Sequence, residues 1–124
     1  MKVKIDTKEK FHVLDIEEPS LSANMTEELN QKLLQYLEKD IKNVVLKMGH
    51  VYDVDEPAAR SLANIQQQFY DNNVSFVICG IRPEVEKYLD KIELLEVLNF
   101  TPTESEAWDI VQMEEIEREL DLNP

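Results

Sequence analysis

Two short apolar segments, with a helical pattern between them, limit the folds open to this chain. Residues 43–48 read Asn-Val-Val-Leu-Lys-Met, and residues 74–79 read Val-Ser-Phe-Val-Ile-Cys. Apolar runs of this length are typical of strands that are buried on both faces. Between them, Pro57 opens a segment whose apolar residues recur at helical spacing as far as Phe69. This pattern predicts two neighbouring parallel strands joined by a right-handed helical crossover, and hence an α/β fold.

The remaining segments supply the other elements of such a fold. Alternating apolar residues predict two N-terminal strands with a hairpin turn at residues 8–10. Thr103 and Glu106 have the spacing of a capping box, which predicts the start of a last helix. The predicted elements are strands over 2–6 and 11–17, a helix over 24–37, a short helix from Pro83, a brief edge strand within 94–100, and a helix from 103 to about 120. The helix over 24–37 is expected to be capped either by Asn24 with Glu27 or by Ser22. We therefore expect a single domain over residues 1–124, with a mixed sheet of four or five strands and helices packed mainly on one face.

The charge of the chain restricts its partners. It has 26 acidic and 13 basic residues, a formal net charge of -13, and no cluster of Lys and Arg. Nucleic acids and anionic membranes are bound through basic patches, so we predict neither as a partner and expect a protein partner instead. The one cysteine, Cys79, excludes an internal disulfide, and the first residues lack an apolar signal core, so we expect a cytoplasmic protein.

No residue pattern predicts catalysis or a cofactor. The chain has only two glycines, which excludes a glycine-rich phosphate loop, and neither His12 nor His50 has a recognisable nucleophile beside it. His50, Asp53, Asp55 and Glu56 cluster before the helix that opens at Pro57, but their spacing matches no known cation loop. The simpler interpretation is that Asp55 or Glu56 caps that helix, so we predict no metal and no enzyme activity. Cys79 and Trp108 are interpreted as packing residues.

The C-terminal helix has an unusual composition. Residues 103–124 contain a single basic residue, Arg118, and eight acidic ones: Glu104, Glu106, Asp109, Glu114, Glu115, Glu117, Glu119 and Asp121. Ile110, Met113, Ile116 and Leu120 nevertheless form a stripe at helical spacing. The first interpretation is a helix that packs against the domain and exposes its acidic face. The alternative is an acidic amphipathic extension, over residues 112–124, that docks a basic partner or a second copy of the chain.

The order of elements resembles the STAS domain, named for sulphate transporters and anti-sigma factor antagonists. Residues 43–55 resemble the central strand of that family and its following loop, which ends in Asp-Ser-Ser-Gly. Residues 81–85, Ile-Arg-Pro-Glu-Val, resemble the Ser-Pro-Glu-Val start of a family helix. Residues 94–107 are similar to the family's Leu-Asp-x-Leu-Phe-x-Ile stretch and final helix, and the acidic end of the chain is similar to that of some single-domain anti-sigma factor antagonists.

The chain departs from the family pattern at one functional position. If Asp55 is aligned with the aspartate of Asp-Ser-Ser-Gly, then Glu56 replaces the serine that is phosphorylated in the family. Pro57 and Ala58 replace the second serine and the glycine. Ser61 is the nearest hydroxyl but lies a full turn further into the helix, and Ser22 stands where the family often has an acidic residue. The resemblance therefore implies a regulator in which the phosphorylation switch has been lost.

In the family, the unmodified serine form binds a kinase-type anti-sigma factor, and phosphorylation releases it. The resemblance thus implies a non-enzymatic, protein-binding regulator of bacterial transcription. Glu56 is then either a fixed phosphate mimic or the partner of a basic residue on another protein. The expected contact surface comprises Ser22, Ala23, Asn24, Asp55, Glu56, Pro57, Ala59 and Arg60. The alternative is a structural STAS subunit of a larger signalling or lipid-transport assembly, and a homodimer is compatible with both.

Overall fold

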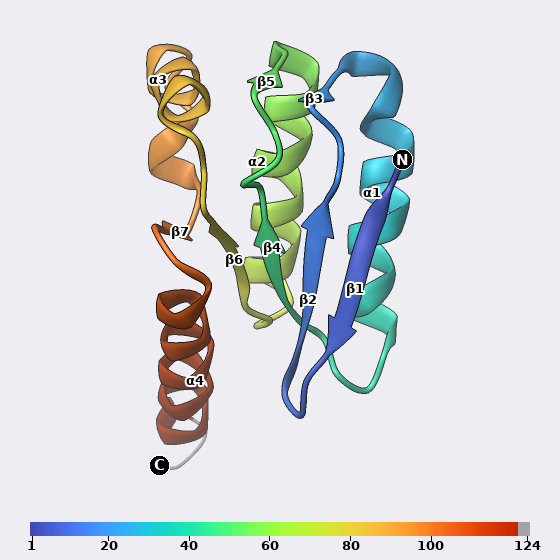
Figure 1. Cartoon of the computed structure of the whole chain (residues 1–124). Coiled ribbons are helices and arrows are strands. Elements are labelled where there is room, and N and C mark those ends of the chain that lie inside the picture. Colours follow the sequence, from blue (N-terminus) through green and yellow to red (C-terminus); the bar gives the residue numbers. More distant parts are fainter. Residues whose placement is uncertain (122–124) are drawn as a thin grey trace.

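A computed structural model describes residues 1–121 of the chain. Its main sheet has five strands in the order β1-β2-β4-β6-β7, and a separate two-stranded sheet pairs β3 with β5 (Figure 1). The strands are β1 (Val3–Thr7), β2 (Phe11–Ile16), β3 (Ser20–Leu21), β4 (Asn43–Lys47), β5 (Asp53–Val54), β6 (Phe76–Cys79) and β7 (Phe100–Thr101). The helices are α1 (Thr26–Leu34), α2 (Glu56–Asp71), α3 (Pro83–Lys91) and α4 (Glu104–Asp121), with 3₁₀ turns η1 (Ala23–Met25), η2 (Gln35–Glu38) and η3 (Leu95–Val97).

The predicted centre of the sheet is confirmed. Strand β4 lies between β2 and β6 and is parallel to both, with Val45 opposite Val13 on one side and Val77 on the other. The apolar side chains of β4 and β6 are buried, as expected for strands covered on both faces. The predicted hairpin is also present, because β1 and β2 pair antiparallel. The brief edge strand is β7, which pairs parallel to β6.

Helices cover both faces of the sheet, with three of the four on one face. The larger core contains Leu46 and Ile78 from the sheet, Leu29 from α1, Leu62 from α2 and Leu89 from α3. Figure 1 shows α1 and α2 behind the sheet. A smaller core on the other face joins the opposite side chains of the strands to α4. The expectation of helices packed mainly on one face is confirmed, with α4 as the exception.

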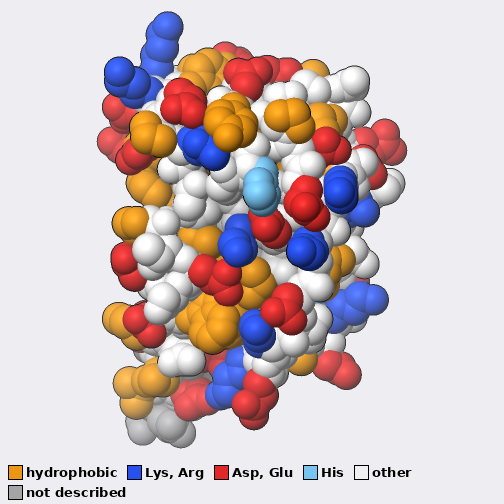
Figure 2. Space-filling view, in the orientation of Figure 1, with side chains coloured by type: hydrophobic (Ala, Val, Ile, Leu, Met, Phe, Trp, Pro, Cys, Tyr) orange, Lys and Arg blue, Asp and Glu red, His pale blue; other side chains and the backbone are white. Residues whose placement is uncertain are grey.

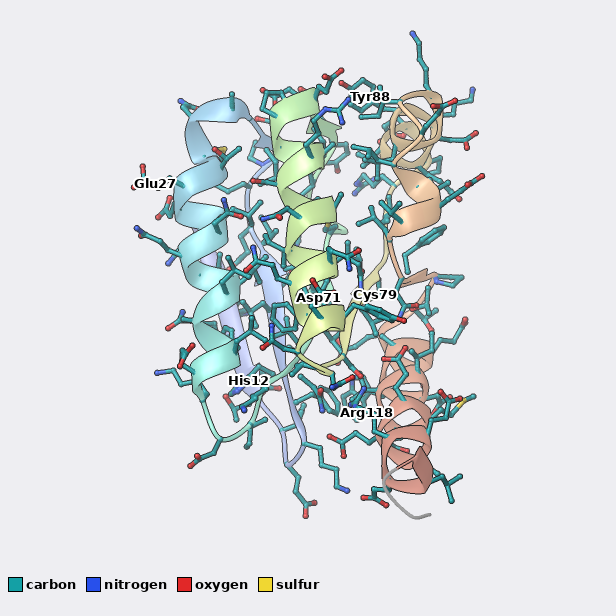
Figure 3. All side chains as sticks on the ribbon, turned by 180° about the vertical axis from the view of Figure 1, so that it is seen from behind. His12, Glu27, Asp71, Cys79, Tyr88 and Arg118 are labelled. Atoms are coloured by element: carbon teal, nitrogen blue, oxygen red, sulfur yellow. The ribbon has the colours of Figure 1, made fainter. Side chains whose placement is uncertain are left out.

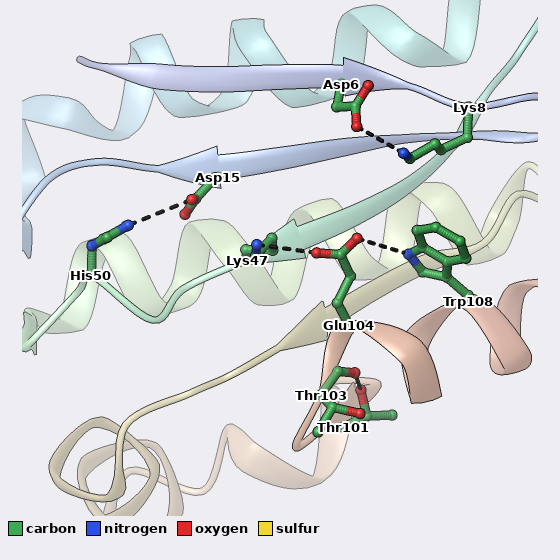
Figure 4. Close-up of polar contacts among 9 residues, drawn as sticks. All are labelled: Asp6, Lys8, Asp15, Lys47, His50, Thr101, Thr103, Glu104 and Trp108. Atoms are coloured by element: carbon green, nitrogen blue, oxygen red, sulfur yellow. Dashed lines mark hydrogen bonds and ion pairs between the residues drawn. The ribbon is translucent and has the colours of Figure 1, made fainter.

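Trp108 anchors α4, as predicted. Its ring meets the edge of the Phe11 ring with centroids 5.2 Å apart, and its indole N–H donates to the Glu104 carboxylate over 3.1 Å. That carboxylate also pairs with the ammonium of Lys47, on β4, at 3.0 Å (Figure 4). The hydrogen bond to Glu104 raises the pKa of Lys47 above its ordinary value. The first turn of α4 is therefore fixed to the sheet by both aromatic and charged contacts.

The start of the first helix differs from the prediction. Asn24 with Glu27 does not form a capping box, because residues 23–25 form the 3₁₀ turn η1 and α1 begins only at Thr26. Ser22 occupies the position before η1, but its hydroxyl bonds the side chain of Asn24 rather than a backbone N–H. The backbone N–H of Ala23 is instead satisfied by Asp55, a residue 32 positions away. A long-range contact has replaced the local cap.

The apolar stripe of α4 packs against the domain only at Ile110, which contacts the smaller core. The first interpretation of that helix therefore holds for its first turns and is wrong for the rest of the stripe. Met113, Ile116 and Leu120 are exposed. The inner face is made by Ala107 and Val111, followed by polar side chains. Residues 122–124 of the predicted extension lie outside the described residues. In the described part of the chain, no helix is both long and apolar enough to cross a membrane.

Candidate functional site

The first turn of α2 presents the residues that the sequence singled out. Asp55 is the N-cap of α2, with extended backbone geometry, and its Oδ1 accepts the N–H of Ala58 at 3.0 Å. Glu56 is the first helical residue, and Pro57 follows it where no backbone N–H is needed. The prediction that an acidic residue caps this helix is confirmed, and Asp55 is that residue. Both carboxylates also lie at the positive end of the helix dipole.

Asp55 also ties a second loop to the start of α2. Its Oδ2 accepts the N–H of Ala23 at 2.8 Å, and its own N–H donates to the carbonyl of Leu21 at 3.0 Å. The short pairing of β3 with β5 runs directly into this junction (Figure 1). The two predicted parts of the contact surface, residues 22–24 and the start of α2, are therefore adjacent. One carboxylate joins them.

Glu56 is available to a partner. Its side chain is 53% exposed and pairs with Arg60, 60% exposed and one turn along, at 3.2 Å. An exposed pair of this spacing is worth about 0.3–0.5 kcal/mol, so a partner can displace it at little cost. Pro57, Ala23 and Asn24 are exposed as well. These exposed residues surround the start of α2.

Two predicted residues have other surroundings. Ala59 lies on the inner face of α2 and is fully buried. It therefore belongs to the core and is not part of this surface. Ser61 is half-buried, and its hydroxyl lies 3.4 Å from the side-chain oxygen of Asn30 on α1. Helical geometry thus turns Ser61 toward α1, away from the exposed face that carries Glu56 and Arg60. Ser61 is therefore poorly placed to present its hydroxyl to a kinase on the exposed face of α2.

A shallow groove borders this surface on the side of α3. It has a volume of about 360 Å³ and is lined by Asp53, Asp55, Glu84 and Tyr88, among others. Beside it, the guanidinium of Arg82 stacks 3.8 Å from the centroid of the Tyr52 ring and donates to the carbonyl of Gly49 at 2.8 Å. Sequence reasoning missed this groove because its walls come from residues 52–55 and from α3, two segments far apart in the sequence that share no motif. The exposed aromatic Tyr52 was the one available signal.

The acidic residues around His50 do not converge on a common point. His50 pairs with Asp15 of β2 at 3.5 Å (Figure 4). Asp55 instead accepts two backbone N–H groups. Among residues 1–121, no three His, Cys, Asp or Glu side chains are grouped so that they could hold a cation. On the face shown in Figure 2, acidic and basic side chains are interspersed around a single histidine. No convergent ligand set is visible there.

The two remaining candidates are structural. His12 is buried between the hydroxyl of Thr7 and the carbonyl of Ile41, each 2.9 Å from one ring nitrogen. Cys79 is buried at the end of β6, and burial raises the pKa of its thiol to about 11. A thiol that stays protonated at neutral pH is a poor nucleophile. Both residues therefore serve the packing of the domain.

Comparison with known proteins identifies the class. The STAS domain family matches residues 2–107. An anti-sigma factor antagonist from Mycobacterium paratuberculosis is 13% identical, with a TM-score of 0.76 over 90% of this chain and 93% of its own. RsbS of Moorella thermoacetica, solved with one serine replaced by glutamate, is 22% identical, with a TM-score of 0.76 over 95% and 99%. A chain from the stressosome, described as a signal integration and transduction hub, is 21% identical, with a TM-score of 0.69 over 88% and 96%.

The chain belongs to the STAS domain family, because the match covers most of its length. The resemblance noted from the sequence is thereby confirmed, as is the fold that it implied. The match ends within the first turn of α4, at Ala107. Most of α4, including its exposed apolar stripe, lies C-terminal to the matched residues.

Proposed function

We propose that this protein is a non-enzymatic regulator of the anti-sigma factor antagonist type, which binds a protein partner through the start of α2 and the adjoining residues 22–24. The observation that carries this proposal is the position of Glu56. Its carboxylate is exposed at the first residue of α2, beside the loop held by Asp55. This is the position at which the sequence resemblance places the family's phosphorylated serine.

The charge of Glu56 makes the surface permanently anionic. A phosphoserine would carry a charge of about -1.5 to -2 at neutral pH, and a phosphatase could remove it. Glutamate carries a charge of -1 that no phosphatase can remove. The surface is therefore fixed in one electrostatic state. A partner that covers Glu56 must provide a basic group, since an unpaired carboxylate buried in an interface is unfavourable. We infer a partner with an Arg or Lys opposite Glu56, for which a kinase-type anti-sigma factor is the first candidate.

Phosphorylation of the wild type and a serine variant tests the lost switch. The chain and its Glu56→Ser variant are each incubated with a kinase-type anti-sigma factor from the same host and ATP. Phosphate on the intact protein and on its peptides is then located by mass spectrometry. The wild type is expected to carry no phosphate at residues 55–58, and the variant is expected to gain an acceptor there. Stoichiometric phosphate on Ser61 of the wild type would contradict the proposal, because it would restore a switch one turn away.

A second candidate function is a structural subunit of a signalling assembly. It is favoured by one observation, the similarity in fold to a chain of the stressosome. Size-exclusion chromatography of the affinity-tagged protein from its host separates the two candidates. A complex of this protein with one or two partner proteins would support its role as a regulator. A particle containing many STAS chains supports the structural subunit.

A further inference from the structure

The outer face of α4 combines an exposed apolar stripe with a rim of acidic side chains. Met113, Ile116 and Leu120 are 58%, 57% and 66% exposed. Successive residues of a helix are turned by about 100°, so these three lie on one side, opposite the buried Ala107 and Val111. Asp109 and Glu117 flank the stripe and are exposed. Large apolar side chains that gather on a soluble domain in this way mark an interaction site.

Specific contacts on the inner face hold the stripe outward. Glu114 accepts from the hydroxyl of Ser75 at 2.6 Å, and Glu115 accepts from the side-chain amide of Asn43 at 2.6 Å. Arg118 donates to the same Ser75 hydroxyl at 3.1 Å (Figure 3). Turning the apolar stripe inward would remove these three hydrogen bonds, and the buried Ser75 hydroxyl would lose both of its side-chain partners on α4. The orientation of α4 is therefore built into the fold.

We propose that the outer face of α4 docks a basic amphipathic helix of another protein. An apolar stripe at helical spacing fits the apolar face of a second helix, with anchors at corresponding intervals. Charge complementarity selects the partner. Arg118 is the only basic residue of α4, and it faces inward to Ser75, so the rim of the stripe is acidic. Lys and Arg beside the apolar anchors of the incoming helix would pair with this rim.

The same charges disfavour two other occupants. In a symmetric dimer through this face, the acidic rim of one copy would face the acidic rim of the other. Like charges opposite one another in an interface weaken binding. An anionic membrane surface would repel the rim in the same way. This proposal concerns a surface other than the start of α2. Its failure would leave the role proposed for Glu56 unaffected.

Nuclear magnetic resonance titration of the full chain tests the proposal with designed probes. The first probe is an 18-residue helical peptide with leucine at one face and lysine elsewhere. The matched probes are a peptide of the same composition with a scrambled order, and one with glutamate in place of each lysine. Saturable binding of the first peptide is expected, with the largest amide shifts in residues 109–121. Neither matched peptide is expected to bind comparably.

Variants of the chain assign the binding to the stripe. Replacing Met113, Ile116 and Leu120 together by glutamine is expected to weaken binding of the first peptide at least about tenfold. The matched control is Ile5→Gln, because Ile5 is 54% exposed on β1, at the edge of the sheet away from α4, and it is expected to leave affinity unchanged. All four side chains are exposed, so circular dichroism should show both variants folded.

Four results would overturn the proposal. They are equal binding of the scrambled peptide, amide shifts centred outside α4, an unchanged affinity of the stripe variant, and self-association of the wild type that the stripe variant abolishes. The last result, measured by sedimentation velocity, would assign the stripe to a second copy of the chain.

Discussion

Removing the carboxylate of Asp55 should separate the two halves of the candidate surface and destabilise the fold. In Asp55→Ala, the N–H groups of Ala58 and Ala23 both lose their acceptor, at 3.0 Å and 2.8 Å in the intact protein. Loss of a helix cap costs about 1 kcal/mol, and loss of a second hydrogen bond to a charged acceptor adds about 1.5 kcal/mol. We therefore expect the free energy of unfolding to fall by about 2–3 kcal/mol.

An asparagine at this position separates the two contributions. Asparagine is as good an N-cap as aspartate, so Asp55→Asn should keep the bond from Ala58. Its amide NH₂ cannot accept the N–H of Ala23, and the cost should be about 1–1.5 kcal/mol. Asp53→Ala is the matched control, because Asp53 is exposed two residues earlier, and it should cost less than about 0.5 kcal/mol.

Urea unfolding followed by circular dichroism measures all three variants on one scale. The expected order of destabilisation is Asp55→Ala, then Asp55→Asn, then Asp53→Ala. Amide exchange should also rise at Ala23 in both Asp55 variants. If Asp55→Ala cost no more than Asp53→Ala, the argument that one carboxylate joins the loop to α2 would be refuted.

Three further predictions concern Cys79 in the core and Asn43 beside α4. At pH 8 the thiol of Cys79, with its pKa raised to about 11, should react with iodoacetamide about 100-fold more slowly than a free cysteine, and comparable rates would contradict its burial. The same shift means that the unfolded chain loses this proton first, so stability should fall as pH rises from 9 toward 11, less so in Cys79→Ala. Asn43→Ala removes the acceptor of the buried Ser75 N–H and one donor to the Glu115 carboxylate, and it should cost about 2–4 kcal/mol in urea unfolding. A cost below about 1 kcal/mol would contradict the inner polar network.

The sequence was sufficient to predict the framework, because the framework follows from local patterns. Apolar runs identify β4 and β6, and helical spacing after Pro57 identifies α2. One of the two acidic residues before Pro57 was correctly expected to cap that helix, and it is Asp55. Each of these inferences needs only residues within a few positions of one another. The physical preferences of such segments agree with the final fold.

The candidate site and the orientation of α4 depend on contacts between residues that are far apart in the sequence, so they could not be predicted from local patterns. Asp55 meets Ala23 across 32 positions, and β3 pairs with β5 over only two residues each, too few for a periodic pattern. The stripe on α4 has the spacing of a buried face, yet Asn43 and Ser75 at the ends of two strands turn the helix the other way. Polar groups that need partners overrode hydrophobic periodicity there. A single sequence does not reveal which buried amide will meet which carboxylate.

The central claim is that Glu56 lies in the partner interface and supplies its charge. Isothermal titration calorimetry tests it with the partner captured from the host, using the wild type, Glu56→Gln, and Glu38→Gln as a matched exposed control on η2. Loss of a buried interfacial charge pair costs about 2–5 kcal/mol, so Glu56→Gln should weaken binding at least about tenfold, with Glu38→Gln unchanged. Equal affinities for all three proteins would contradict the account.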